Sequence, residues 1–233
     1  MNRWRAVVFD LDDTLYPERD YVRGGFEAVG RWAFETLGEE PQAVFDELWA
    51  MFEAGVRRDT FDRWLRNRGR KPEPDRAGMI EAYRRHRPRL SPYPDVIPAL
   101  EGLRGTAHLG LITEGPRAVQ NAKLEALGLR SAFDKVVVLG EEERQEWKPN
   151  RLPFDRWLEG ADIRPERSVY LGDNPAKDFL GARRAGWASI RVRRSDGLHR
   201  SEEPLGAEAR PDREIADLQS LETILATLEV DSR

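Results

Sequence analysis

Cysteine is absent from the 233 residues, and no uninterrupted apolar run approaches the length that spans a membrane. Without cysteine the chain has no disulfides, no thiolate metal sites and no cysteine nucleophile. The first five residues lead directly into an apolar stretch and leave no room for a signal peptide. We therefore expect a cytoplasmic protein with no membrane-bound part.

The chain also lacks a large excess of charge of one sign. Lysine and arginine number 38 and aspartate and glutamate 42, so the net charge is −4. Nucleic-acid binding needs a concentrated basic face, whereas the arginine-rich pieces 63–71 and 84–89 are surrounded by acidic residues. We expect no nucleic-acid partner. The length suits one large domain, or a core domain with a smaller inserted one.

Residues 7–15, VVFDLDDTL, join an apolar run rich in β-branched residues to three carboxylates and a threonine. The run predicts a buried central strand, and ligands bind beyond the carboxyl ends of such strands. Alternation would point Asp10 and Asp12 the same way. Converging carboxylates are costly unless a cation or a proton lies between them. The alternative is a polar loop that merely follows a strand.

A second polar site follows the apolar residues 109–112. Thr113 precedes Glu114 and Gly115, and Pro116 is typical of a helix start. A hydroxyl beside the unpaired N–H groups of a helix N-terminus suits a phosphate. An ordinary helix cap is the alternative.

Two more sites carry a lysine and two aspartates. Lys148 precedes a proline, and a lysine held there could neutralise both a phosphate and an aspartate; a surface lysine is the alternative. Asp173 ends another apolar run, and Asp178 opens the next helix. Oxygen-only ligands at the end of a sheet suit Mg²⁺. For Asp178 alone, a helix-start acid favoured by the macrodipole is the alternative.

The hydrophobic pattern changes along the chain. Between residues 18 and 87 apolar and aromatic residues recur at helical spacing, with no strand pattern. Strands at about 109–112, 136–139, 169–171 and 188–192 then alternate with helices at about 96–103, 119–127, 154–158, 179–185 and 218–228. This alternation predicts a doubly wound, Rossmann-like parallel sheet in an α/β core domain, residues 1–16 plus 92–233, with an all-helical insert at 17–91. Residues 195–213 lack periodicity and are interpreted as a mobile loop.

In order and spacing, these sites resemble the four motifs of the haloacid dehalogenase (HAD) superfamily. Residues 10–14 match its Asp-x-Asp-x-Thr motif, and Thr113 and Lys148 match the second and third motifs. Asp173 and Asp178 match the Gly-Asp-x-x-x-x-Asp form of the fourth. The insert looks like the C1 cap of the family. One departure is Glu114, where the second motif commonly has asparagine, so the role of Glu114 is open.

The resemblance implies a mechanism. Asp10 would attack phosphorus and form an aspartyl-phosphate, and Asp12 would serve as general acid and then general base. Lys148 and Mg²⁺ would neutralise charge, while Thr113 would hold phosphoryl oxygens.

The resemblance also implies a set of metal ligands. Asp10, the carbonyl of Asp12 and Asp173 would bind the metal. Asp178 would bind it through water or orient Lys148.

The candidate substrate-binding residues are Thr14, Glu114, Gly115, Arg19 and Arg23. Thr14 would orient the loop of Asp12. Arg19 and Arg23 favour an anionic substrate such as a sugar phosphate, or else they are ordinary solvated residues of the first cap helix.

The dehalogenases of the superfamily lack an acid at the position of Asp12, so Asp12 favours phosphoryl transfer. We predict a Mg²⁺-dependent phosphatase that hydrolyses a small soluble phosphomonoester. A phosphotransferase or phosphomutase of the same superfamily and a non-catalytic binding protein with this fold are the alternatives. We expect a monomer, with a homodimer through the cap as the alternative.

Overall fold

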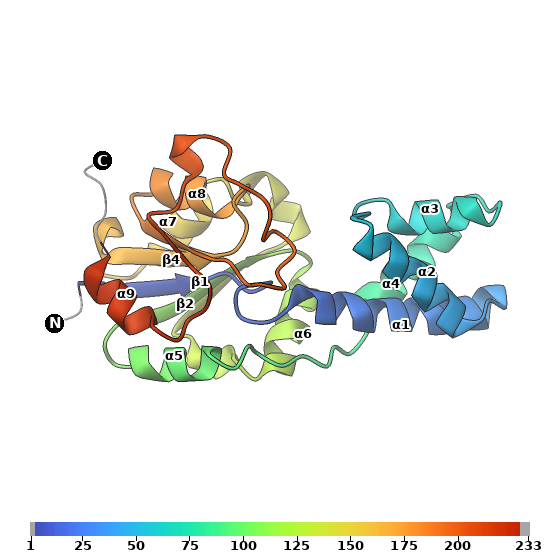
Figure 1. Ribbon diagram of the computed structural model, residues 1–233, viewed down its shortest axis with the longest axis horizontal. Coiled ribbons are helices and arrows are strands. Elements are labelled where there is room, and N and C mark those ends of the chain that lie inside the picture. The colour runs from blue at the N-terminus through green and yellow to red at the C-terminus, as the bar shows by residue number, and fades with distance from the viewer. Residues whose placement is uncertain (1–2, 229–233) are drawn as a thin grey trace. The chain divides into compact units, whose positions relative to one another are not determined.

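The computed structural model describes residues 3–228, and the chain divides into two compact units (Figure 1). One unit consists of Met1–Glu18 and Ser91–Arg233, and the other of Arg19–Leu90. The two units are called the core unit and the helical unit below.

The core unit is built on a six-stranded parallel sheet with the strand order β3-β2-β1-β4-β5-β6. The strands are β1 (Ala6–Phe9), β2 (His108–Glu114), β3 (Lys135–Leu139), β4 (Ser168–Gly172), β5 (Ala188–Val192) and β6 (Arg213–Ile215). Strands β1, β4 and β5 are buried along their whole length, because helices cover both faces of the sheet. The predicted α/β class with a Rossmann-like sheet is confirmed.

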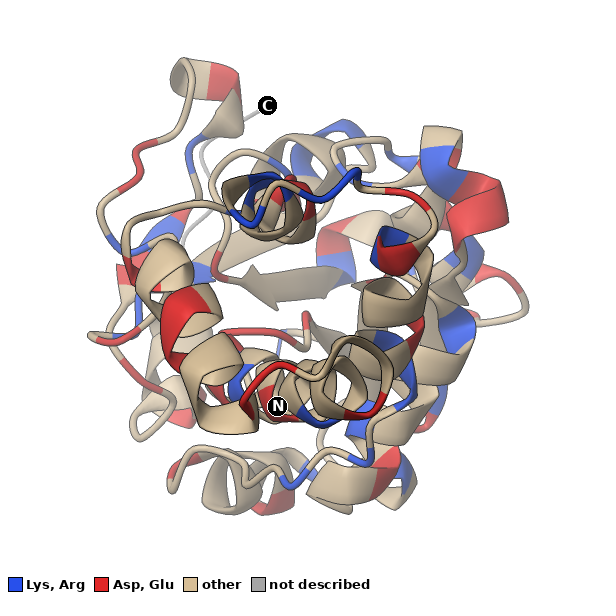
Figure 2. Cartoon of the chain, turned by 90° about the vertical axis from the view of Figure 1, so that its right-hand side faces the viewer, with Lys and Arg blue, Asp and Glu red and all other residues tan. Residues whose placement is uncertain are grey.

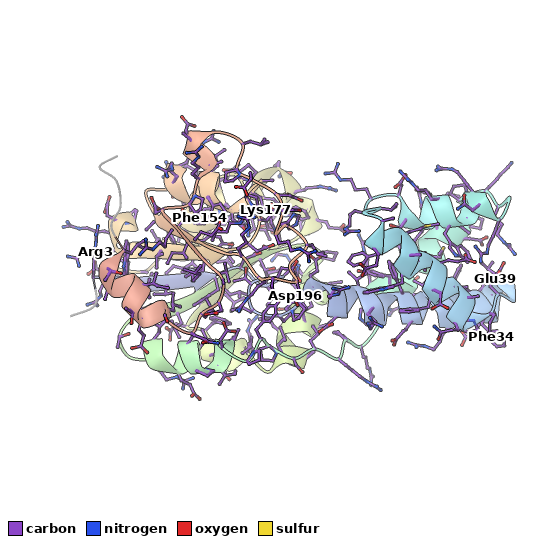
Figure 3. The ribbon with its side chains drawn as sticks, in the orientation of Figure 1. Arg3, Phe34, Glu39, Phe154, Lys177 and Asp196 are labelled. Carbon is purple, nitrogen blue, oxygen red and sulfur yellow. The ribbon has the colours of Figure 1, made fainter. Side chains whose placement is uncertain are left out.

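Helices α7 (Leu152–Leu158) and α8 (Asp178–Arg184) lie on one face of the sheet, and α5 (Val96–Leu103), α6 (Arg117–Leu127) and α9 (Leu221–Thr227) lie on the other (Figure 1). On the first face Phe154, labelled in Figure 3, packs edge-on against Tyr170 and Trp187. Trp157 lies directly over Gly110 of β2, where a Cβ atom would collide with its indole ring. This close packing fixes the helices that carry part of the site.

The helical unit contains most of α1 (Glu18–Leu37), together with α2 (Pro41–Glu53), α3 (Thr60–Asn67) and α4 (Asp75–Arg85). The ring of Phe26 contacts those of Phe52, Phe61 and Tyr83, so the aromatic residues of this segment form a core of their own.

No helix among residues 3–228 is both long and apolar enough to span a membrane. Figure 2 shows that positively and negatively charged residues are both spread over the elements of the chain.

The strands and α-helices of the core unit follow the predicted order, with one added strand. Strand β6 starts at Arg213, the last residue of the stretch that we interpreted as a loop, and pairs with β5. Within that stretch the backbone N–H of Leu198 donates a hydrogen bond to Asp13 Oδ2 at 2.7 Å, and Asp196 Oδ1 accepts one from the hydroxyl of Tyr93 at 3.1 Å. His199 in the same stretch contacts Asn174 and Glu202.

Candidate active site

The four sequence motifs meet at one edge of the sheet. Asp10 follows β1, Thr113 and Glu114 end β2, and Asp173 follows β4. Asp178 is the first residue of α8. Because the strands are parallel, their carboxyl ends lie at the same edge, which is where α/β sheets bind ligands.

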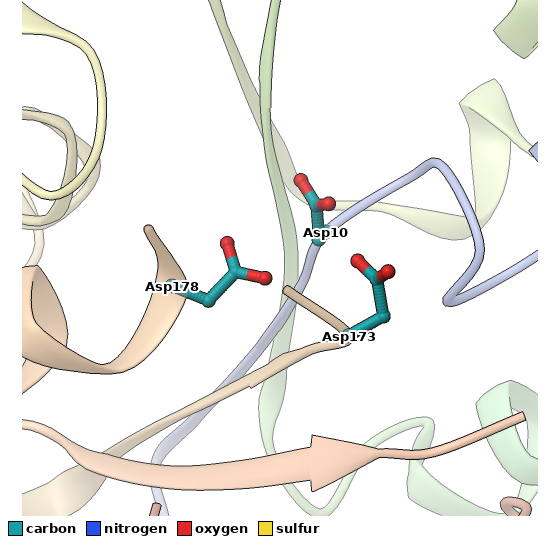
Figure 4. Close-up of side chains that lie close together, drawn as sticks. All are labelled: Asp10, Asp173 and Asp178. Carbon is teal, nitrogen blue, oxygen red and sulfur yellow. The ribbon is translucent and has the colours of Figure 1, made fainter. Parts of the chain in front are cut away.

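Three buried acids converge at this edge (Figure 4). One carboxylate oxygen each from Asp10, Asp173 and Asp178 lies within 4.8 Å of the others. Burial, together with the negative charges of Asp178 and Asp10, raises the pKa of Asp173 well above its usual value. A cation among these oxygens would remove that repulsion, and an all-oxygen donor set suits a hard divalent ion. The residues therefore fit a metal such as Mg²⁺.

Lys148 joins two of these acids. Its Nζ donates to Asp10 Oδ1 at 2.8 Å, to Asp178 Oδ1 at 2.8 Å and to the Tyr170 hydroxyl at 2.6 Å. Burial would lower the pKa of Lys148, but the charges of Asp10 and Asp178 outweigh it and the net shift is upward. Burial likewise would raise the pKa of Asp10, yet Lys148 and Lys177 hold it below its usual value. Asp10 is thus kept ionised.

The Gly-Asp sequence at the end of β4 has a steric reason. A Cβ atom on Gly172 would lie 2.5 Å from Asp178 Oδ2, so a larger residue would displace that carboxylate. Oδ2 of Asp178 also accepts a hydrogen bond from the backbone N–H of Asn174 at 2.8 Å. Asp178 is therefore held by the backbone on one side and by Lys148 on the other.

At the second motif, the side chain of Glu114 contacts the backbone of Lys148. Its carboxylate accepts a hydrogen bond from the backbone N–H of Lys148 and so helps to hold the backbone of that lysine in place. Burial raises the pKa of Glu114. The side chain of Gln120 donates to the Glu114 carbonyl at 2.5 Å and occupies the space beside Gly115, whose φ is 136°. Thr113 is buried at the end of β2.

Asp12 has partners of its own. Its Oδ1 accepts a hydrogen bond from Lys123 Nζ at 2.7 Å and another from the Tyr16 hydroxyl. The three-acid cluster, as found among the described residues, does not include the Asp12 side chain. The predicted contribution of Asp12 to the metal, through its carbonyl oxygen, stays a prediction.

The loop after β1 is held mainly through Asp13. This residue has a left-handed backbone, with φ of 52°, and its carboxylate accepts from the N–H groups of Glu18 and Leu198 at 2.8 and 2.7 Å. Thr14 is buried, and its hydroxyl has no hydrogen-bond partner among the described residues. Its carbonyl accepts from Arg194 at 3.0 Å.

Arg19 and Arg23 lie in the helical unit. Arg19 pairs with Glu53 at 2.5 Å, and both guanidinium groups lie over the Trp49 ring, at 5.6 Å for Arg19 and 4.5 Å for Arg23. Their proposed role in binding substrate stays a prediction.

Sequence reasoning missed two lysines near the site. Lys123 lies on the buried face of α6. Because a lysine is rarely buried unless it has a partner, its position among the apolar residues of this helix could have identified it as a candidate site residue. Lys177, labelled in Figure 3, has its Nζ 3.9 Å from Asp10 Oδ2 and is the residue just before Asp178. For Lys177 burial would lower the pKa, but the charge of Asp10 raises it overall.

Comparison with known proteins places this site in a family. Residues 4–186 match the model of haloacid dehalogenase-like hydrolases. The chain belongs to that family. It is 35% identical over 235 residues to a glyceraldehyde 3-phosphate phosphatase from Methanopyrus kandleri, covering 97% of this chain and 99% of the relative.

A phosphoserine phosphatase from Thermus thermophilus is 32% identical over 251 residues, covering 93% of this chain and 97% of the relative. The solved structure of a 2-haloacid dehalogenase from Pseudomonas syringae pv. Tomato is similar, with a TM-score of 0.64, 28% identity and coverage of 96% and 98%. The predicted superfamily is confirmed. The phosphatase relatives indicate a phosphoric monoester hydrolase, the enzyme class that the sequence predicts.

Proposed function

We propose that the protein is a Mg²⁺-dependent phosphatase that hydrolyses a small soluble phosphomonoester through an aspartyl-phosphate. The observation that carries this proposal is the convergence of Asp10, Asp173 and Asp178 around a buried Lys148. An ionised nucleophile, an acidic cluster and a fixed cation within one site match the needs of transfer of an anionic phosphoryl group.

The acid cluster would hold the metal. Asp10 and Asp173 would supply carboxylate ligands and the carbonyl of Asp12 would add one from the backbone, while Asp178 would bind the metal through water or orient Lys148. When bound, Mg²⁺ neutralises charge on the transferring phosphoryl group. The remaining positive charge near the nucleophile comes from Lys148 and Lys177.

Asp10 attacks phosphorus in line with the ester oxygen. A bond forms between the carboxylate oxygen and phosphorus as the bond to the leaving alkoxide breaks. Lys148 holds Asp10 Oδ1, and therefore fixes the direction in which the carboxylate faces. Thr113 and the N–H groups at the start of α6 bind phosphoryl oxygens.

Asp12 completes each half of the reaction. It gives its proton to the leaving alkoxide and later takes one from the water that attacks the aspartyl-phosphate, which releases Asp10 and phosphate. An acid at this position distinguishes a phosphatase from the dehalogenases of the family, because a halide leaving group needs no proton.

The helical unit would act as a cap that excludes water and selects the substrate. The named relatives act on glyceraldehyde 3-phosphate and phosphoserine, which are both small phosphorylated molecules. A substrate of that size is proposed here, with Thr14, Glu114, Gly115, Arg19 and Arg23 as candidate contacts. A cytoplasmic location and a monomeric state belong to the same proposal.

The test is phosphate release from a panel of phosphomonoesters, with and without Mg²⁺, by the wild type and by Asp10→Asn. The panel contains 4-nitrophenyl phosphate, sugar phosphates, nucleotides, phosphoserine and glyceraldehyde 3-phosphate. Asp155→Asn is the matched control, because among the described residues Asp155 of α7 forms an ion pair only with the exposed Arg151. We expect Mg²⁺-dependent turnover in the wild type and the control, and a loss of about 10³-fold or more in Asp10→Asn.

Metal binding is measured separately by calorimetry, since it needs no substrate. We expect Asp173→Asn to weaken Mg²⁺ binding, whereas Asp155→Asn leaves it unchanged. Metal binding without turnover of any ester would contradict the phosphatase proposal. Exchange of phosphate between sugar positions with little hydrolysis would also contradict the phosphatase proposal and would indicate a phosphomutase.

A further inference from the structure

The carboxylate of Asp12 is held by two donors that both bind the same oxygen. Lys123 Nζ donates to Oδ1 at 2.7 Å, and the Tyr16 hydroxyl donates to Oδ1 as well. Asp12 Oδ2 accepts no hydrogen bond from the residues that the structure describes. The two oxygens of this carboxylate are therefore in different environments.

Lys123 reaches Asp12 from a different part of the chain, 111 residues away. Its side chain is only 5% exposed, so its ammonium group requires a polar partner. Lys123 and Gln120 lie three residues apart, which places them on the same face of α6. Gln120 binds the carbonyl of Glu114, so one helix face contacts both the second motif and Asp12.

Tyr16 fixes the same carboxylate from its own loop. The backbone segments of Asp12 and Tyr16 are paired, and the Tyr16 side chain is buried. A rotation of the carboxylate about its bond to Cβ would break both the Tyr16 and the Lys123 hydrogen bonds. Asp12 is thereby restricted to one orientation.

We propose that Lys123, with Tyr16, is a positioning residue that makes Oδ2 the proton-carrying oxygen of Asp12. An oxygen that accepts from an ammonium group and a hydroxyl is a poor place for a proton, so the proton resides on Oδ2. In the first step the Oδ2–H bond breaks and the leaving alkoxide gains that proton while its bond to phosphorus breaks. In the second step Oδ2 takes a proton from water as the oxygen of that water bonds to phosphorus and the bond between phosphorus and the Asp10 carboxylate breaks, which releases phosphate. This inference rests on the proposed phosphatase function.

The test compares two esters of similar shape whose leaving groups differ in basicity. 4-Nitrophenyl phosphate leaves as a stable phenolate that needs no proton, whereas benzyl phosphate leaves as an alkoxide that does. The measured quantity is kcat/KM, which includes the first chemical step. We expect Lys123→Met to lower kcat/KM for benzyl phosphate by roughly 10- to 100-fold, which is part of the roughly 10²- to 10⁴-fold that a general acid contributes. For 4-nitrophenyl phosphate we expect a change of less than about threefold.

Three further variants separate positioning from a merely structural role. Tyr16→Phe, which removes one donor, should show the same pattern with a smaller loss, and Lys123→Arg should restore part of the benzyl phosphate activity. Lys135→Met is the matched control. Lys135 donates to the carbonyls of Arg156 and Glu159 at 2.8 Å, so its loss should not change the ratio of the two esters.

Equal losses on both esters in Lys123→Met and Tyr16→Phe would overturn the positioning role and leave the phosphatase function standing. An unchanged ester ratio when Lys123→Met is folded and active would do the same. No Mg²⁺-dependent turnover of either ester by the wild type would overturn the phosphatase proposal and this one with it.

Discussion

At the scale of single residues, the buried ammonium group of Lys148 is shared by Asp10 and Asp178. Removing it would leave two buried carboxylates without their cation, and breaking such a pair costs about 3–5 kcal/mol. We therefore expect Lys148→Met to lower the free energy of unfolding by about 3 kcal/mol in the presence of a chelator. Mg²⁺ should restore part of this loss, because the cation binds the same acids in the folded state.

The measurement is urea unfolding followed by circular dichroism, with EDTA and with Mg²⁺. Lys71→Met is the control, since Lys71 is exposed and its change should stay within about 0.5 kcal/mol. A free energy of unfolding that does not change with Mg²⁺ in either the wild type or Lys148→Met would argue against a cation site at these acids.

Some residues of the proposed site can be predicted from their positions along the sequence, and others cannot. Asp10, Thr113 and Asp173 each end an apolar run, and parallel strands bring such ends to one edge. The bond from Lys123 to Asp12 depends on how side chains on a helix and on a loop are directed across 111 residues. The helical spacing of apolar residues predicts that this face of α6 is buried, but it does not identify the side chain that a buried lysine on this face will contact.

At the scale of elements, Asp95 connects three segments of the core unit. It precedes α5, and its Oδ2 accepts from Arg194, after β5, at 2.7 Å and from the N–H of Leu218, before α9, at 2.5 Å. Burial would raise the pKa of Asp95, but these hydrogen bonds and the charge of Arg194 hold it below 3.8.

This shift predicts how stability depends on pH. Because the pKa is lower in the folded state, the contribution of Asp95 is complete well above pH 4, declines as the unfolded state takes up a proton, and is lost below the folded pKa. We expect Asp95→Asn to be less stable than the wild type at pH 7, and the difference in the free energy of unfolding to shrink as the pH falls below 4. Chemical unfolding at a series of pH values checks this; a constant difference between the two proteins would refute it.

Strand β6 and the segment before it show where sequence patterns fail at this scale. Three residues, Arg213–Ile215, are too few and too polar to predict a strand, and only pairing with β5 makes them one. The buried Arg191 likewise donates to the carbonyls of Asp173, His199 and Glu202. A segment without periodicity is thus held by backbone acceptors that no residue pattern reveals.

At the scale of the whole molecule, the chain leaves and re-enters the core unit at neighbouring points. Glu18 and Ser91 bound the helical unit, and the N–H of Tyr93 donates to the carbonyl of Leu15 at 2.9 Å. We expect a chain in which a short Gly-Ser linker replaces residues 19–90 to fold and to bind Mg²⁺ through its three acids. It should lose its preference among phosphomonoesters, since the proposed cap is gone.

Circular dichroism and calorimetry test this shortened chain, and the same chain with Asp173→Asn is the control that should not bind the metal. An unfolded product would mean that the core unit depends on the helical unit for its stability.

The neighbouring positions of the two junctions at Glu18 and Ser91 also have a consequence for the evolution of such a chain. A gene segment inserted there can be lengthened, trimmed or exchanged with that of a relative while every strand of the sheet keeps its register. New substrate preferences can then arise by recombination of whole segments, while the acids of the proposed site keep their places at the edge of the sheet.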